Sequence, residues 1–365
     1  MIETIKTNWT KEEVLAIYNK PLLELVYEAA QIHRLHHDPN KVQISSLISI
    51  KTGGCPEDCA YCPQAARYHT EVKISELLPV HQIKAQALRA KQHGVSRICL
   101  GAAWRNVKDG EDFDQVLDMV RTVTRLDMEV CCTLGMLTEN QAKRLEEAGL
   151  YAYNHNIDSS EDYYKEVIST RGFEDRLKTI NNVRKTSITV CSGGIIGMGE
   201  KIEDRCDMLR ILANMTPQPE SVPINALVAV EGTPMEDQEP VSIFEMVRMV
   251  ATARIVIPKT QVRLSAGRTS MSPEGQTLCF MAGANSIFAG DKLLTTPNPD
   301  INQDKKMFDE LGIVAQTPFE KYPKREVVDA EDAHFHALGE NPKWTRPAHT
   351  IERNELAKEK GKVQL

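Results

Sequence analysis

Hydrophobic residues along most of this chain follow two patterns that alternate with each other. Between the short apolar runs, positions such as Phe113, Val116 and Val120 recur every three to four residues and predict amphipathic helices. The short, β-branched runs themselves predict eight strands. These expected strands are Gln43–Lys51, Arg97–Ala103, Glu129–Leu134, Ala152–Ile157, Ile188–Gly193, Val222–Val230, Gln261–Ala266 and Ser286–Phe288. Eight strands alternating with helices favour an α/β fold, a closed (β/α)8 TIM barrel.

An open, doubly wound sheet is the structural alternative. The lack of a G-x-G-x-x-G run after the first expected strand disfavours it. The two ends of the chain differ from the central pattern. Thr10 and Glu13 form a capping-box pattern that starts a helical region, whereas from about residue 303 the regular spacing fades into charged sequence. We therefore expect an N-terminal helical extension at 1–40, the barrel at 41–302, and an irregular, partly disordered C-terminal extension at 303–365.

Composition narrows the class of protein. Of the 365 residues, 41% are hydrophobic and 26% are charged, which is ordinary for a soluble globular protein. A formal net charge of −7 and the lack of a basic run argue against a nucleic-acid-binding surface. No apolar stretch approaches the roughly 18 residues of a membrane span, and the N-terminal residues carry no export signal. Nine cysteines without such a signal indicate a reducing compartment, so we expect a cytoplasmic enzyme.

Three cysteines lie close together after the first expected strand, in the run Gly-Gly-Cys-Pro-Glu-Asp-Cys-Ala-Tyr-Cys-Pro. The C-x3-C-x2-C spacing would let Cys55, Cys59 and Cys62 hold three corners of a four-iron cluster, which leaves one iron open to another ligand. Tyr61, just before the last cysteine, favours an adenine-bearing cofactor at this cluster. Structural zinc, with His69 as a fourth ligand, and a disulfide framework are the alternatives.

Three further cysteines lie within expected strands rather than in loops. Cys99, Cys131 and Cys191 could all point into the barrel, as could Arg263, because side chains alternate across a strand. Each cysteine could also be a small buried apolar residue. A buried arginine needs charged partners, however, so the four residues could hold a second, two-iron cluster. Cys132 should point to the opposite side from Cys131, and which of the two belongs to the site stays open.

Other polar residues gather where the expected strands end, at the edge where barrel enzymes build their sites. Asp158 follows the fourth strand and could accept hydrogen bonds from ribose hydroxyls. Gly194 and Gly197 follow the fifth strand, where glycines either let the backbone approach a ligand or only form a turn. Asn225 lies within the sixth strand, where its amide could recognise a urea-like substrate. These residues predict a cofactor and substrate site at one end of the barrel.

The assembled motifs closely resemble the biotin synthase family of radical S-adenosylmethionine (SAM) enzymes, over roughly residues 9–300. The matching phrases include Lys-Thr-Gly-Gly-Cys-Pro-Glu-Asp-Cys-Ala-Tyr-Cys-Pro-Gln, Tyr-Asn-His-Asn-Ile-Asp, Cys-Ser-Gly-Gly-Ile-Ile-Gly-Met-Gly-Glu and Val-Arg-Leu-Ser-Ala-Gly-Arg. The resemblance implies a [4Fe-4S] cluster that chelates SAM, and a [2Fe-2S] cluster deep in the barrel. The resemblance implies that the ligands of the first cluster are Cys55, Cys59 and Cys62. The ligands of the second would be Cys99, Cys131, Cys191 and Arg263, and Cys132 would not be a ligand.

The resemblance also implies an activity, in which a 5′-deoxyadenosyl radical and the sulfur of the second cluster convert dethiobiotin to biotin. Asn156 would be catalytic together with Cys191 and Arg263, and would contact both SAM and substrate. Asp158 and Arg176 would contact SAM, and Asn225 dethiobiotin. Further implied partners are a second copy of the chain, a flavodoxin-type electron donor and the iron–sulfur assembly machinery.

Two other functions remain to be separated from this one. Another barrel radical SAM enzyme, of the methylornithine synthase or hydrogenase-maturation type, would share the loop cysteines. A zinc-binding or redox-sensing protein would use the thiols without sulfur chemistry. The three strand cysteines and Arg263 favour sulfur insertion.

Overall fold

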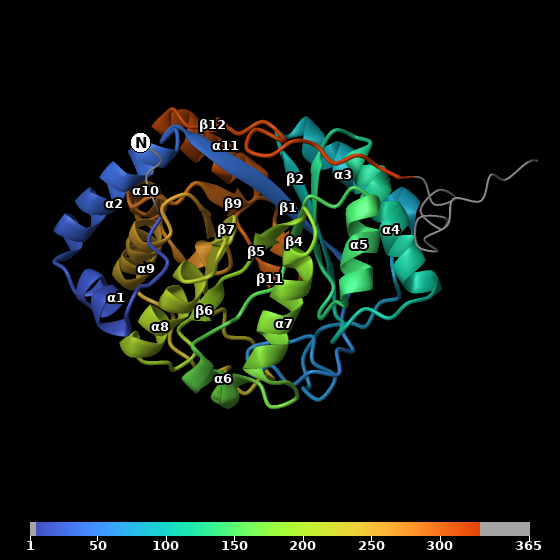
Figure 1. Ribbon diagram of the computed structural model, residues 1–365, viewed down its shortest axis with the longest axis horizontal. Coiled ribbons are helices and arrows are strands. Elements are labelled where there is room, and N and C mark those ends of the chain that lie inside the picture. Colours follow the sequence, from blue (N-terminus) through green and yellow to red (C-terminus); the bar gives the residue numbers. More distant parts are fainter. Residues whose placement is uncertain (1–4, 329–365) are drawn as a thin grey trace, which may run out of the picture. The chain divides into compact units, whose positions relative to one another are not determined.

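Eight parallel strands form a closed barrel in the computed structural model, which describes residues 5–328 (Figure 1). The barrel strands are β1 (Lys41–Lys51), β2 (Arg97–Ala102), β3 (Glu129–Thr133), β4 (Ala152–Asn154), β5 (Thr189–Cys191), β7 (Ser221–Ala226), β8 (Gln261–Leu264) and β9 (Ser286–Phe288). They pair in this order, and β9 closes the barrel by pairing with β1. The short strand β6 (Gly194–Ile196) continues from β5 and pairs with β7. The predicted TIM barrel is therefore confirmed.

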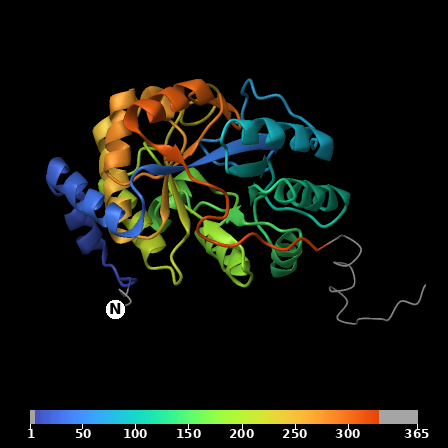
Figure 2. The same cartoon turned by 90° about the horizontal axis from the view of Figure 1, so that it is seen from above.

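Helices surround the barrel and begin where the sequence pattern places them. The predicted capping boxes of Thr10 and Thr138 are both present, and the Ser272 hydroxyl caps the helix that starts at Pro273. The helices are α1 (Lys11–Tyr18), α2 (Leu22–His36), α3 (Val80–Gln92), α4 (Glu111–Thr124), α5 (Glu139–Glu147), α6 (Glu161–Val167), α7 (Phe173–Arg184), α8 (Ile202–Ala213), α9 (Ile243–Val256), α10 (Pro273–Met281) and α11 (Ile301–Leu311). Figure 2 shows α1 and α2 as an extra layer outside the ring, where they pack against α8 and α9. None of the described helices is long and apolar enough to cross a membrane.

Several strands are shorter than their apolar runs. The sixth run was expected to reach Val230, but β7 ends at Ala226. The fourth was expected to reach Ile157, but β4 ends at Asn154, after which the amide of Ile157 donates to Gly193 O at 3.1 Å. Ile157 is buried in the loop after β4, whereas residues 227–230 after β7 are half-buried or exposed. Apolar composition therefore continues past the last ladder hydrogen bond and does not mark the end of a strand.

The barrel wall separates two apolar clusters. The larger lies between the strands and the helices, and it contains Cys132, Cys206 and Cys279. The smaller lies inside the barrel, and it contains Cys99 and Cys131. Adjacent residues of one strand point to opposite faces, so the chain sends Cys131 inward and Cys132 outward.

The chain after the barrel is regular for longer than expected. Helix α11 begins at Ile301, and a side-chain oxygen of Asp300 caps its N-terminus. The expected domain boundary between residues 302 and 303 therefore falls inside this helix. The strand β12 (Val314–Ala315) then pairs with the start of β1. The residues that follow cross the end of the barrel opposite the cysteine loop, as the orange-red segment in Figure 1 shows. The chain divides into two compact units between Val327 and Val328. The partial disorder expected in the C-terminal extension cannot be compared at residues 329–365, because these lie outside the described residues.

Candidate active site

The loop that follows β1 carries Cys55, Cys59 and Cys62 at the C-terminal end of the barrel strands. Gly53 and Gly54 begin it with φ near +71° at both positions, a conformation that side chains disfavour. The loop then closes on itself, because the amide of Cys55 donates to Gln64 O at 3.0 Å and that of Cys62 to Cys59 O at 2.9 Å. All three cysteines line one cavity of about 320 Å³. The structure thus brings the three thiols together at an open space.

Burial acts strongly on these thiols. It raises the pKa of Cys59 to about 11 and that of Cys62 to about 12. The guanidinium of Arg171 partly offsets this at Cys59, since its Nη2 lies 3.7 Å from Sγ. Without a metal, the three thiols therefore keep their protons. Bound iron would stabilise the thiolate forms, and sulfur is a soft donor, so the three residues suit an iron–sulfur cluster. The residues present therefore fit the implied group.

Asp158 is the centre of a polar network on one side of this cavity. Its Oδ2 accepts a hydrogen bond from the Tyr61 hydroxyl at 3.1 Å and pairs with Arg176 Nη2. Arg176 is held in turn by Tyr164, whose hydroxyl accepts from Nε at 3.1 Å. Burial, with the Asp158 charge beside it, raises the pKa of Tyr61 well above its usual value. Tyr61 therefore keeps its proton and donates, which fixes the carboxylate at the cavity wall.

Asn156 and Asn225 also line the cavity and are held by backbone groups. Asn156 Oδ1 accepts from the amide of Gly193 at 3.2 Å. Asn225 Nδ2 donates to Gly194 O at 2.9 Å, and its Oδ1 accepts from the amide of Ala266 at 3.1 Å. The Asn225 amide is thus fixed in orientation, and each of its polar atoms keeps one further hydrogen-bonding position for a ligand.

Gly194 and Gly197 lie beside the cavity but do not line it. A Cβ on Gly194 would lie 2.0 Å from the sulfur of Met208. Gly197 has φ +91°, and its amide donates to Glu200 at 2.8 Å. Close packing and turn geometry account for both glycines. Their contact with a cofactor stays a prediction.

The second group of thiols lies deeper in the barrel, and all of its members are buried. Cys99 pairs in register with Cys131, and the Cys131 thiol donates to Cys132 O at 3.9 Å. The neighbouring Cys131 thiol, with the charges of Arg263 and Arg97, lowers the pKa of Cys99. Arg263 has no exposed surface, and its Nη1 lies 3.8 Å from Cys191 Sγ. The four residues thus share the barrel interior, as a two-iron cluster would require.

Arg263 is fixed by neutral groups on neighbouring strands. Its Nε donates to Ser286 Oγ at 2.9 Å, and its Nη2 donates to Gln43 Oε1 at 3.0 Å. No carboxylate lies within ion-pairing distance of it among the described residues. A fully buried guanidinium held only by neutral groups and a thiol is costly without an anionic partner, and thiolates bound to iron would supply one.

Sequence reasoning missed several residues of this region. Arg97 and Glu129 form a buried ion pair with Nη2 and Oε2 2.7 Å apart. They stand two residues before Cys99 and Cys131, so strand alternation alone would have placed them inside the barrel. Arg171 gave no such signal, because it reaches Cys59 across 112 residues of sequence.

Two family models match the sequence of this chain. Residues 49–212 match the family model described as Radical SAM superfamily, and residues 223–314 match the Biotin and Thiamin Synthesis associated domain. The second match extends past the expected barrel boundary at 302 and includes α11.

Curated relatives match over most or all of the chain. The biotin synthase of Flavobacterium johnsoniae is 72% identical over 363 residues, covering 100% of both chains. That of Myxococcus xanthus is 59% identical and covers 85% of this chain and 89% of its own. Among solved structures, methylornithine synthase superposes with a TM-score of 0.71 over 90% of this chain and 96% of its own, at 19% identity, which shows a shared fold. The chain therefore belongs to the biotin synthase family of radical SAM enzymes.

Proposed function

We propose that this protein converts dethiobiotin to biotin by inserting sulfur between two unactivated carbon atoms, with SAM as cosubstrate. The observation that carries the proposal is the buried Arg263 beside Cys191, in the same barrel interior as Cys99 and Cys131. A radical SAM enzyme without sulfur insertion needs the loop cysteines but has no use for this second group. The family to which the chain belongs supports the same reaction.

Two inorganic groups would divide the chemistry between them. Held by Cys55, Cys59 and Cys62, a [4Fe-4S] cluster would supply the electron that cleaves SAM, while a [2Fe-2S] cluster, held by the deeper cysteines and Arg263, would supply the sulfur. Both assignments rest on residue placement and on the family.

The cavity of about 320 Å³ beside the loop cysteines is called the upper cavity below. Its polar residues would bind and orient the two substrates. The hydrogen bonds to Asp158 meet at Oδ2, so Oδ1 is available to a ribose hydroxyl of SAM. Arg176 has the charge to attract the SAM carboxylate. Asn225 would present its remaining N–H and lone pair to the ureido group of dethiobiotin, and Asn156 would lie between the two ligands. The apolar barrel wall excludes water that would quench a radical.

Deeper in the barrel, hydrogen bonds prepare Cys191 as a sulfur ligand. Asn154 Nδ2 lies 3.6 Å and Arg263 Nη1 lies 3.8 Å from its Sγ. Both groups are donors that point at the sulfur, so both would support an electron-rich ligand at this position.

The proposal includes further partners that rest on the family resemblance. We expect a homodimer in the cytoplasm, reduced by a flavodoxin-type protein and loaded by the iron–sulfur assembly machinery. Sedimentation of the reconstituted protein tests the dimer directly.

The decisive test is product formation under anaerobic conditions from dethiobiotin, SAM and a reductant. We expect biotin, and we expect the reconstituted protein to contain iron and acid-labile sulfide with little zinc. SAM cleavage without biotin would assign the chain to another radical SAM reaction. Stoichiometric zinc without sulfide would contradict cluster chemistry altogether.

A further inference from the structure

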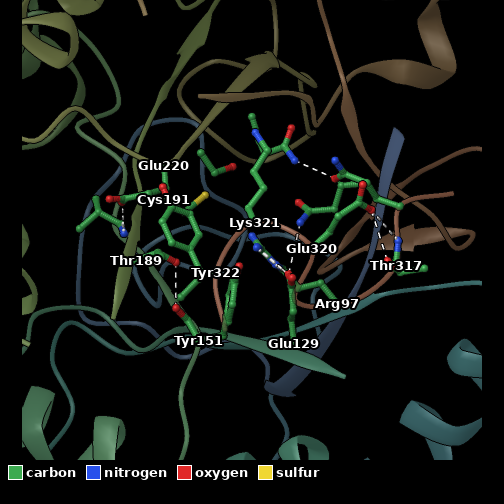
Figure 3. A pocket seen from close by; sticks show the side chains of 16 residues that line it. Arg97, Glu129, Tyr151, Thr189, Cys191, Glu220, Thr317, Glu320, Lys321 and Tyr322 are labelled. Carbon is green, nitrogen blue, oxygen red and sulfur yellow. Dashed lines mark hydrogen bonds and ion pairs between the residues drawn. The ribbon is translucent and has the colours of Figure 1, made fainter. Parts of the chain in front are cut away.

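A second, small cavity lies at the N-terminal end of the barrel, on the opposite side of the deep thiols from the upper cavity. Its volume is about 20 Å³, room for about one water molecule. Cys191 lines it, whereas Cys99 lines the upper cavity. Figure 3 shows the side chains around it, with the Cys191 sulfur among them. The second group of thiols therefore lies between two cavities, one at each end of the barrel.

The walls of this lower cavity are polar and incompletely satisfied. Arg97 and Glu129 contribute charges of both signs. Ser221 Oγ and Gln261 Oε1 are buried without a hydrogen-bond partner, and both residues line the cavity while only 3% exposed. Buried polar atoms in native proteins are normally paired, with protein groups or with small bound species. These two atoms therefore point to a small polar occupant rather than to an empty apolar gap.

One segment of the chain, residues 316–322, closes this cavity from outside, and we call it the mouth cover. Its contacts to the barrel are aromatic as well as polar. The rings of Phe319 and Tyr322 lie edge-on to that of Tyr151, with centroids 5.7 and 6.4 Å away, and Phe319 packs against the apolar cluster inside the barrel. Gln316 Oε1 accepts from Gln261 Nε2 at 2.8 Å, and the amide of Phe319 donates to Glu129 Oε1 at 2.8 Å. The carboxylate of Glu320 pairs with Lys41 Nζ at 2.5 Å.

The mouth cover is more open to water than the barrel beneath it. None of its residues is buried, and Thr317, Glu320, Lys321 and Tyr322 are exposed. The side chains of Lys41 and Glu320 are 36% and 30% exposed, and ion pairs so open to water contribute little. The segment is therefore anchored mainly by the aromatic contacts to Tyr151. A surface segment without a buried side chain can open locally without global unfolding.

We propose that the N-terminal mouth of the barrel is an entrance for small inorganic ions, ferrous iron and hydrosulfide, to Cys191 and its neighbouring thiols, and that the mouth cover opens to admit them. The inference rests on the proposed sulfur insertion, since each turnover would consume sulfur that must be replaced. An entrance at this end reaches the deep thiols while substrate fills the upper cavity. Charged walls of both signs suit a cation and an anion alike.

Thiol accessibility in the full-length, metal-free protein tests the entrance without any assay of activity. Each cysteine is followed separately by peptide mass spectrometry during alkylation with iodoacetamide. Phe319→Ala removes the ring that packs against Tyr151, and we expect it to speed alkylation of Cys191 roughly fivefold. Glu320→Gln removes only an exposed ion pair, so we expect a smaller increase, of about twofold. Glu139→Gln is the matched control, because that exposed carboxylate pairs with Lys143 and Lys185 and with no residue of the mouth cover.

Three cysteines outside the barrel report on global unfolding. Cys132, Cys206 and Cys279 are fully buried between strands and helices, and their rates should not change in the mouth-cover variants. Unchanged alkylation of Cys191 would overturn the proposal, and so would a parallel rise at these three thiols.

A second measurement follows the ions themselves. In a background that lacks the three loop cysteines, ferrous iron and sulfide can build only the deeper cluster, with a mild oxidant added to take one electron from each iron. Its visible absorbance should appear faster in Phe319→Ala than in the control, and equal rates would contradict an entrance here. Neither readout uses substrate, so a failure to make biotin would refute the function and leave the entrance standing.

Discussion

Arg263 and Cys191 face each other inside the barrel from β8 and β5, with Arg263 Nη1 3.8 Å from Cys191 Sγ. The strand between them, β7, carries Pro223 in register with Arg263 and Ser221 in register with Cys191. Two residues 72 positions apart in sequence are thus brought into contact across the barrel. Strand alternation predicted that both side chains face the barrel interior, but their direct contact exists only once the sheet has closed.

The adjacent cysteines of β3 offer a matched pair of variants. We expect Cys131→Ala to lose the deeper cluster and biotin formation while it keeps the loop cluster, because Cys131 points into the barrel beside Cys99. Cys132→Ala should keep both clusters and lose only about 1 kcal/mol of stability from the small cavity it leaves. Iron and sulfide content with visible spectra measures the first effect, and denaturant unfolding the second. Equal cluster loss in both variants would contradict the inward placement of Cys131.

The buried pair of Arg97 and Glu129 should show strong coupling. Glu129→Gln leaves the Arg97 guanidinium buried without its partner, so we expect a loss of about 3–5 kcal/mol in the free energy of unfolding. Replacing both residues, as in Arg97→Met with Glu129→Leu, should recover much of this loss. A double-mutant cycle by urea denaturation measures the coupling. Additive effects of the two single changes would show that the pair does not act as a unit.

Tyr61 should matter for SAM rather than for folding. Tyr61→Phe removes one hydrogen bond to Asp158, which Arg176 still holds, so we expect SAM affinity to fall by up to about tenfold. Tyr68→Phe is the control, because its hydroxyl donates to Asp58 O in the same region of the chain at 2.5 Å. Equilibrium binding of SAM to the reconstituted protein measures the change. Equal loss in the two variants would remove Tyr61 from the SAM site.

Buried histidines should make the metal-free protein sensitive to acid. Burial, with the Arg254 charge nearby, lowers the pKa of His33 from 6.5 to about 3. Between these two values the unfolded chain binds a proton that the folded chain does not, so the free energy of unfolding falls as pH falls. The contribution of His33 approaches about 1.4 kcal/mol per pH unit below pH 6.

Urea denaturation at a series of pH values from 7 to 4.5 checks this expectation. His33→Gln should be less stable at neutral pH but should show a shallower pH dependence than the parent. His93→Gln, at an exposed position, should leave the slope unchanged. An unchanged slope in His33→Gln would show that His33 does not bind its proton on unfolding.

The capped helix starts, the alternation of strands and helices, and the cysteine loop are each encoded by residues close together in the sequence. The sequence alone was therefore enough to predict them. The capping boxes at Thr10 and Thr138 use neighbours three residues away. The C-x3-C-x2-C spacing sets three thiols on one loop whatever surrounds it. Strand alternation likewise predicted opposite faces for Cys131 and Cys132, because a pleated strand has a period of two residues.

The tertiary structure decided what depends on distant partners. Strand ends at Asn154 and Ala226 were set by where ladder hydrogen bonds stop, while the apolar sequence continues into the loops that follow. Arg171 reaches Cys59, and the segment after β12 covers the barrel mouth, only because the closed sheet brings remote residues together. Local pattern encodes the periodicity of each element, whereas the partners of a side chain follow from barrel closure. For that reason the thiols and Arg263 could be found in the sequence, but the approach of Arg171 to Cys59 and the second cavity could not.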